Sequence, residues 1–129
     1  MRSAREMRLK GWWPTVLWAG IIFALSALPD LQSGLPEDFF LRKVAHAVEF
    51  GVLALLAARA LGRGEGWDAK RALKGAFVIS VLYAFSDEFH QAFVPGRSAT
   101  LQDVGVDAFG VMVALAFVYA RARLAHSTT

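Results

Sequence analysis

The hydrophobic and polar positions divide the chain into four apolar stretches, separated by short polar or glycine-rich segments. Each stretch approaches the roughly 20 residues that an α-helix needs to cross the hydrocarbon core of a bilayer. Turn signals such as Pro29, the run from Gly62 to Gly66, and Pro95-Gly96 separate the stretches. The pattern predicts helices over about residues 12–28, 38–61, 72–92 and 101–122. We therefore expect an all-α fold, an integral membrane four-helix transmembrane bundle, formed as one domain by residues 1–129.

The composition supports a membrane protein. Hydrophobic residues make up 56% of the 129 positions, and the mean hydropathy is +0.41. Soluble domains usually contain about 45–50% apolar residues. The absence of cysteine excludes a disulfide framework and thiolate chemistry. The net charge of +3 does not indicate a nucleic-acid partner, because the basic residues flank the apolar segments and so reflect membrane topology. The expected partner is the lipid bilayer.

Small residues follow the predicted helices at a spacing of three or four positions. The second helix carries Ala47, Gly51, Ala54 and Ala58, and the third carries Ala76, Ser80, Ala84 and then Glu88. Such stripes allow helix backbones to approach one another closely within a membrane. The segment from Thr100 to Asp103 is typical of a capping box at the start of a helix.

The basic residues are distributed unevenly between the two ends of the predicted bundle. Of the 14 lysines and arginines, only Arg42, Lys43 and Arg97 belong to the end reached by the loops Asp30–Pro36 and Ala92–Ala99. The other eleven belong to the end that holds the N-terminus: Arg2, Arg5, Arg8, Lys10, Arg59, Arg63, Lys70, Arg71, Lys74, Arg121 and Arg123. Since basic segments remain in the cytoplasm, we expect both termini to be cytoplasmic and the two loops to lie outside.

Three of the predicted helices carry polar and ionisable residues at the same outer end. Such residues are expensive near a membrane and usually have a partner or a function there. The helix positions come from hydropathy alone, so this coincidence is independent of the charge count. We expect these residues to form one outward-facing pocket: Lys43, His46, Glu49, Asp87, Glu88, His90, Gln91, Arg97, Asp103 and Asp107.

Two functional interpretations of this pocket involve an envelope ligand. In the first, Lys43, Arg97 and His46 bind an anionic headgroup while nearby carboxylates accept hydrogen bonds from it. In the second, the protein is an intramembrane hydrolase or transferase, in which His46 with a neighbouring acid, or His90 with Asp87, acts as a general base on a lipid-linked headgroup. The sequence offers no clear nucleophile, so we assign no catalytic residue.

Two other interpretations remain open. The pairs His46 with Glu49 and Asp87 with His90 have the i, i+3 spacing that can present two metal ligands together. This spacing is short and common by chance, so we assign no metal site and identify no cofactor. Alternatively, the charges are structural and pair between helices, for example Lys43 with Asp87. The protein would then be a structural or partner-binding membrane protein.

Three segments resemble the VanZ-like family of small bacterial membrane proteins. The third is the most specific, because an acid pair, a glutamine, a proline-glycine-arginine run and later acids follow one another in order. The matching segments are Leu25–Pro29, Lys43–Gly51 and Ser86–Arg97, the last followed by Asp103, Asp107 and Gly110. The chain departs from the family pattern at Asp107, where asparagine is frequent.

The resemblance implies a multi-pass protein of the bacterial cytoplasmic membrane. The founding member of the family is linked to low-level resistance to teicoplanin, a glycopeptide that acts at the outer face of this membrane. The resemblance therefore implies binding or modification of a cell-envelope component there, and a contribution to glycopeptide resistance. A lipid-linked envelope precursor or a glycopeptide would be the partner. The resemblance does not specify a reaction.

Overall fold

The protein is a bundle of four long helices, in agreement with the predicted all-α class. The structure is a computed structural model that describes residues 1–27, 36–96 and 100–127, and these residues contain no strand. The second helix continues into a short π-helical segment, η1. The elements are α1 (Ala4–Ser26), α2 (Pro36–Arg59), η1 (Ala60–Gly64), α3 (Ala69–Gln91) and α4 (Leu101–Ser127).

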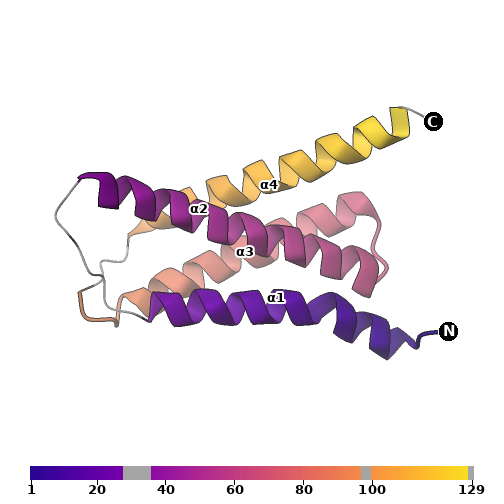
Figure 1. The fold of residues 1–129 in the computed structure, drawn as a ribbon, viewed down its shortest axis with the longest axis horizontal. Coiled ribbons are helices and arrows are strands. Elements are labelled where there is room, and N and C mark those ends of the chain that lie inside the picture. Colours follow the sequence, from indigo (N-terminus) through magenta and orange to yellow (C-terminus); the bar gives the residue numbers. More distant parts are fainter. Residues whose placement is uncertain (28–35, 97–99, 128–129) are drawn as a thin grey trace.

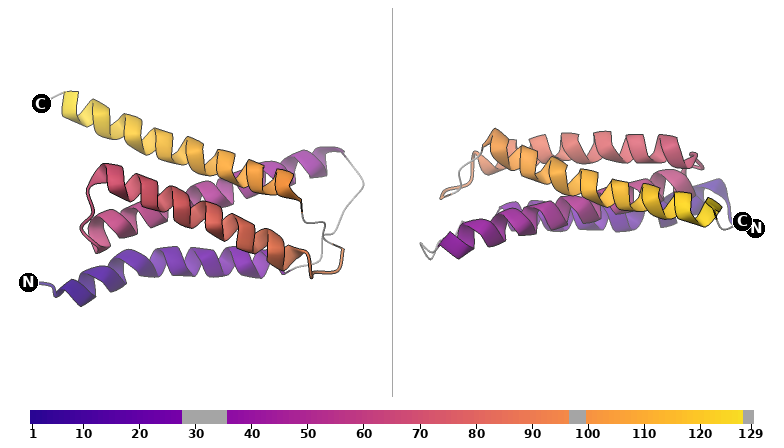
Figure 2. Two further views of the ribbon diagram at one scale, coloured as in Figure 1. Left: turned by 180° about the vertical axis from the view of Figure 1, so that it is seen from behind. Right: turned by 90° about the horizontal axis from the view of Figure 1, so that it is seen from above.

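Successive helices run in opposite directions, so the two termini lie at the same end of the bundle (Figure 1). Helix α2 contacts α1, α3 and α4, and its contact with α4 is the most extensive in the part of the chain that the structure describes. Helices α1 and α4 lie on opposite sides of the molecule (Figure 2). Helix α4 also packs against α3, whereas α1 contacts α3 only slightly, so α2 is the element that links α1 to α4.

Helix α1 begins at Ala4, well before the predicted start near residue 12. A capping box forms here: the Ser3 hydroxyl accepts a hydrogen bond from the Glu6 backbone N–H, and the Glu6 carboxylate accepts one from the Ser3 N–H. These bonds satisfy backbone donors that have no partner within the helix. The charged N-terminal segment is therefore helical although hydropathy excluded it.

Small residues bring α2 and α4 together. A Cβ atom placed on Gly51 would lie 3.2 Å from the carbonyl oxygen of Gly110, and one placed on Gly110 would overlap the backbone of Ala47. The predicted stripe on α3 is also buried, with Ala76, Ser80 and Ala84 at 0% exposure. The hydrophobic core consequently combines larger side chains such as Phe50 and Leu53 with four buried alanines: Ala54, Ala57, Ala76 and Ala84.

The outer surface of the bundle is strongly apolar. Two helical segments, Phe40–Gly64 and Leu101–Ala125, are long and apolar enough to cross a membrane. Only 39% and 22% of their apolar windows are buried inside the bundle, so most of these side chains face outward rather than into a protein core. Such a surface is typical of contact with lipid. Helices α1 and α3 do not meet the same criterion of length, hydropathy and charge, so within the described residues the composition supports two candidate spans rather than four.

Candidate functional site

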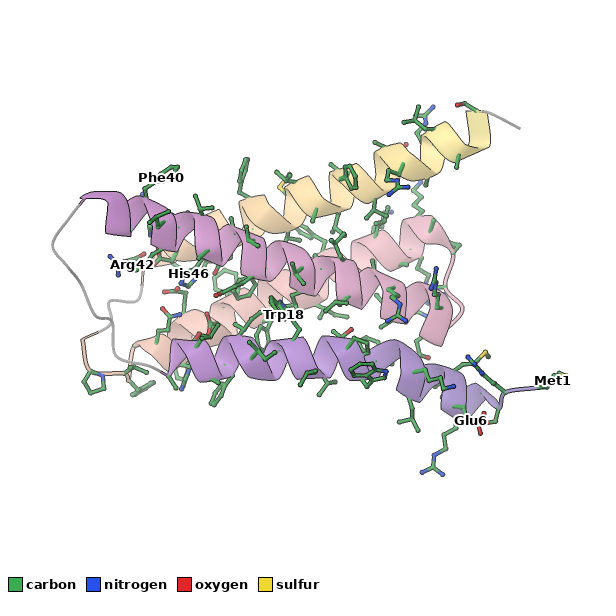
Figure 3. The ribbon with its side chains drawn as sticks, in the orientation of Figure 1. Met1, Glu6, Trp18, Phe40, Arg42 and His46 are labelled. Carbon is green, nitrogen blue, oxygen red and sulfur yellow. The ribbon has the colours of Figure 1, made fainter. Side chains whose placement is uncertain are left out.

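Polar side chains converge at the end of the bundle opposite to the termini. They come from the end of α1, the beginning of α2, the end of α3 and the beginning of α4. Figure 3 shows His46 pointing from α2 into the bundle near this end, whereas Met1 and Glu6 mark the other end. Because successive helices are antiparallel, residues that are distant in sequence lie at the same depth along the bundle axis.

Asp87 is held by a hydrogen-bond network between α1 and α3. The Ser26 hydroxyl donates to Oδ1 of Asp87, and the Gln91 amide donates to Oδ2 at 3.1 Å. The same amide nitrogen also lies 3.3 Å from the Ser26 hydroxyl oxygen. All three side chains are buried, with 2–4% of each residue exposed. Gln91 shares a helix face with Asp87 because it follows four positions later.

His46 and Asp107 form a second pair, between α2 and α4. The imidazole Nδ1 lies 3.2 Å from Oδ1 of Asp107. Asp107 is completely buried, and its second oxygen, Oδ2, has no hydrogen-bond partner among the described residues. Because an unpaired buried polar atom is costly, such an atom suggests a partner from outside the described residues.

The two networks meet. One potential ligand atom from each of His46, Asp87 and Asp107 lies within 4.8 Å of the others. This triad takes His46 from one of the predicted i, i+3 pairs and Asp87 from the other, while Asp107 comes from a third helix. The three side chains therefore form one cluster, in which Asp87 and Asp107 are buried and His46 is partly buried, while their role as a functional site stays a prediction.

Lys43, Asp103 and Glu88 lie around the triad. Lys43 forms a salt bridge with Asp103. The Thr100 hydroxyl accepts a hydrogen bond from the Asp103 N–H at 3.2 Å, which is half of the predicted capping box. The backbone N–H of Thr100 instead donates to Oε2 of Glu88, at 2.9 Å. Oε1 of Glu88 is buried without a hydrogen-bond partner in the described parts of the chain.

The other predicted pocket residues have different surroundings. The His90 ring stacks on Phe23 of α1, with 4.3 Å between ring centroids, and is not part of the triad. Glu49 is half-buried one turn after His46 and close enough to interact with it electrostatically. Its backbone carbonyl accepts a hydrogen bond from Trp18. Arg97 and most of the loop Asp30–Pro36 lie outside the described residues.

Ser26 contributes to the pocket although it was not among the predicted pocket residues. A serine near the end of an apolar helix gives little signal, and its position within the segment Leu25–Pro29 was the only indication. Its hydroxyl donates to Asp87 and not to His46. The described residues therefore contain no serine–histidine pair of the kind that activates a nucleophile.

The arrangement provides three chemical capabilities. An imidazole oriented by a carboxylate can bind a proton or a metal ion. Buried carboxylates can accept hydrogen bonds from hydroxyl or amide groups, and Lys43 lies at the edge of the cluster as a cation. These groups suit a polar ligand that carries both charge and hydrogen-bond donors.

We predict that Lys43 and Asp103 stabilise the bundle as a coupled pair. The side chains are only 22% and 16% exposed, so water screens their attraction less than at an open surface. Thermal unfolding in detergent of Lys43→Met, Asp103→Asn and the double variant should give a coupling free energy of about 1 kcal/mol or more. The double-mutant cycle isolates this pair from other contacts of Lys43, and additive effects would contradict the prediction.

Comparison with known proteins identifies the family. A search of curated proteins and a search of solved structures found no match. Residues 3–123 match the family model described as VanZ/LLP1, which covers almost the entire chain and all ten predicted pocket residues. The chain therefore belongs to the VanZ/LLP1 family.

Proposed function

We propose that this protein crosses the bacterial cytoplasmic membrane four times and binds a cell-envelope component at the outer face. The observation that carries the proposal is the convergence of His46, Asp87 and Asp107, from three different helices, at one end of a bundle whose outer surface carries many large apolar side chains. Ionisable groups at such a position are costly and are usually kept for a function.

The lengths and surfaces of all four helices support four spans. Helices α1 and α3 have 23 residues each, which corresponds to about 35 Å, and the hydrocarbon core is about 30 Å thick. Large apolar side chains face outward on these two helices as they do on α2 and α4. Examples are Val16 and Leu17 on α1 and Val78 and Leu82 on α3, all more than half exposed.

The charge distribution supports the orientation. The end that holds both termini (Figure 1) carries eleven of the 14 lysines and arginines. Basic residues near span ends favour the cytoplasmic side. Both termini are then cytoplasmic, and the cluster around His46 belongs to the outer leaflet.

The chemistry of the cluster supports a headgroup as ligand. Lys43 can attract a phosphate or carboxylate, while Asp87, Asp107 and Glu88 can accept hydrogen bonds from sugar hydroxyl or peptide amide groups. A lipid-linked envelope precursor has both kinds of group, and a glycopeptide has hydroxyls and amides. By binding such a component, the protein would contribute to glycopeptide resistance.

A second candidate function is catalysis on the same headgroup. The 3.2 Å contact between His46 and Asp107 favours it, because an imidazole held by a buried carboxylate is the usual form of a positioned general base. An enzyme would release a modified headgroup when incubated with the lipid-linked substrate. A binding protein would retain the ligand unchanged.

We predict that His46→Ala abolishes function while the protein still inserts into the membrane. Loss of one charge-assisted contact weakens binding by about tenfold or more. Native mass spectrometry of the gently extracted protein should detect a retained lipid with wild type and little with the variant. In cells, the variant should lose any protection against teicoplanin that the wild type gives.

The matched control is His90→Ala, which removes an imidazole from the same end of the bundle but outside the triad. This variant should keep both the retained lipid and the cellular phenotype. The proposal is wrong if His46→Ala and wild type retain the same ligand in the same amount, or if the correctly inserted wild type retains none.

A further inference from the structure

We propose that His46, Asp87 and Asp107 bind one divalent transition-metal ion such as Zn²⁺. The proposal deepens the proposed function and relies on it only for the position of the cluster at the outer face, where envelope cations reach it. A bound cation would add positive charge to the pocket, which would strengthen its attraction for an anionic headgroup.

The geometry is close to that of a metal site. Atoms bonded to one Zn²⁺ ion at about 2.1 Å lie at most about 4.2 Å apart. The three ligand atoms of His46, Asp87 and Asp107 already lie within 4.8 Å of one another. Shifts of less than about 1 Å in side chains would therefore place all three around a single ion. Three protein ligands leave further coordination positions for water or for a headgroup oxygen.

Unpaired buried oxygens give independent support. Asp107 is fully buried, its Oδ1 contacts His46, and its Oδ2 has no hydrogen-bond partner in the described residues. Glu88 is 6% exposed, and its Oε1 is also without a partner there. An ionised carboxylate is rarely buried unless a cation or several donors compensate it. A divalent ion bound by Asp107 would compensate this carboxylate, and Glu88, although not one of the three ligands, lies close enough for its charge to interact with that of Asp107.

One of the three ligands, Asp87, also has hydrogen-bond partners that fix its position. Ser26 and Gln91 hold the carboxylate of Asp87 from α1 and α3. Hydrogen bonds of this kind orient metal ligands and are a regular part of metal centres. Such partners let Asp87 keep its position whether or not a cation is bound.

The ligand types select the class of metal. One imidazole nitrogen with carboxylate oxygens suits Zn²⁺ or Mn²⁺, whereas Ca²⁺ and Mg²⁺ prefer oxygen ligands alone. The cluster contains one nitrogen ligand and at least two carboxylates, from His46, Asp87 and Asp107. We therefore expect Zn²⁺ to bind more tightly than Ca²⁺ or Mg²⁺.

The test is a metal titration of the full-length protein in detergent. The protein is purified through a tag without histidine, stripped with EDTA, dialysed and titrated with Zn²⁺, and bound metal is measured by mass spectrometry. Wild type should bind one Zn²⁺ per chain. His46→Ala and Asp107→Asn should weaken binding by more than about tenfold, and His90→Ala should bind as wild type does. Circular dichroism verifies that each variant is helical.

Two results would overturn the cation site: a helical wild-type protein without stoichiometric Zn²⁺, or equal affinity in wild type, His46→Ala and Asp107→Asn. The titration contains no envelope lipid, so its result is separate from that of the headgroup experiment. A protein that retains a headgroup but binds no Zn²⁺ eliminates only the cation site. A protein that binds Zn²⁺ through His46 but retains no headgroup supports the cation site and eliminates only the headgroup proposal.

Discussion

Gly110→Ala is expected to destabilise the bundle by about 3 kcal/mol, the upper end of the usual range for overpacking. The added methyl group would overlap the backbone of Ala47, and a backbone cannot move aside as a flexible side chain can. Helices α2 and α4 would have to separate, which would also pull His46 away from Asp107. The variant should unfold at a clearly lower temperature in detergent and should retain less headgroup ligand.

Gly105→Ala is the matched control, because it makes the same substitution in the same helix. A Cβ atom on Gly105 has no neighbour within 4 Å, apart from its own helix. Since alanine is the better helix former by up to about 1 kcal/mol, this variant should be as stable as wild type or slightly more stable. Equal unfolding temperatures for Gly110→Ala and Gly105→Ala would contradict the close approach of α2 and α4.

The hydropathy pattern predicted the four helices well because each contains a long apolar segment. It predicted their ends less well. The hydrogen bonds between Ser3 and Glu6 allow α1 to begin at Ala4. This segment is charged, so its low hydropathy gave no indication of a helix. Helix α4 continues to Ser127, beyond the predicted end near residue 122, because no glycine or proline follows to end it. Apolar periodicity thus locates helices, whereas capping and stop signals decide their lengths.

The site was predictable to the extent that charges are rare in apolar helices. His46, Asp87 and Asp107 stood out for this reason and lie together. His90 stood out equally, yet it follows Asp87 by three positions and turns toward Phe23 of α1. Sequence spacing gives only an approximate direction on a helix, and the neighbouring helix decides which residue enters the pocket. Ser26 gave no comparable signal, because one hydroxyl in an apolar helix is common.

Replacing both His46 and Asp107 by leucine is expected to abolish function and to leave the apo protein as stable as wild type or up to about 4 kcal/mol more stable. Asp107 is fully buried with one unpaired oxygen, so a functional cluster carries a desolvation penalty that an apolar pair avoids. The single variant His46→Leu should instead destabilise by about 3–5 kcal/mol, because it leaves the buried Asp107 carboxylate uncompensated. Thermal unfolding in detergent after treatment with EDTA measures both effects.

The stabilities of the double variant and of His46→Leu together distinguish a cluster that is kept for function from one that holds the helices together. If the contact between His46 and Asp107 serves mainly to hold α2 against α4, the double variant should be less stable than wild type and no more stable than His46→Leu. If the contact is kept for function, the double variant should recover the stability that His46→Leu loses, while retained headgroup and bound Zn²⁺ both disappear. Proteins often sacrifice stability at active or binding sites for this reason. A double variant that is both stable and functional would show that the ligand binds elsewhere.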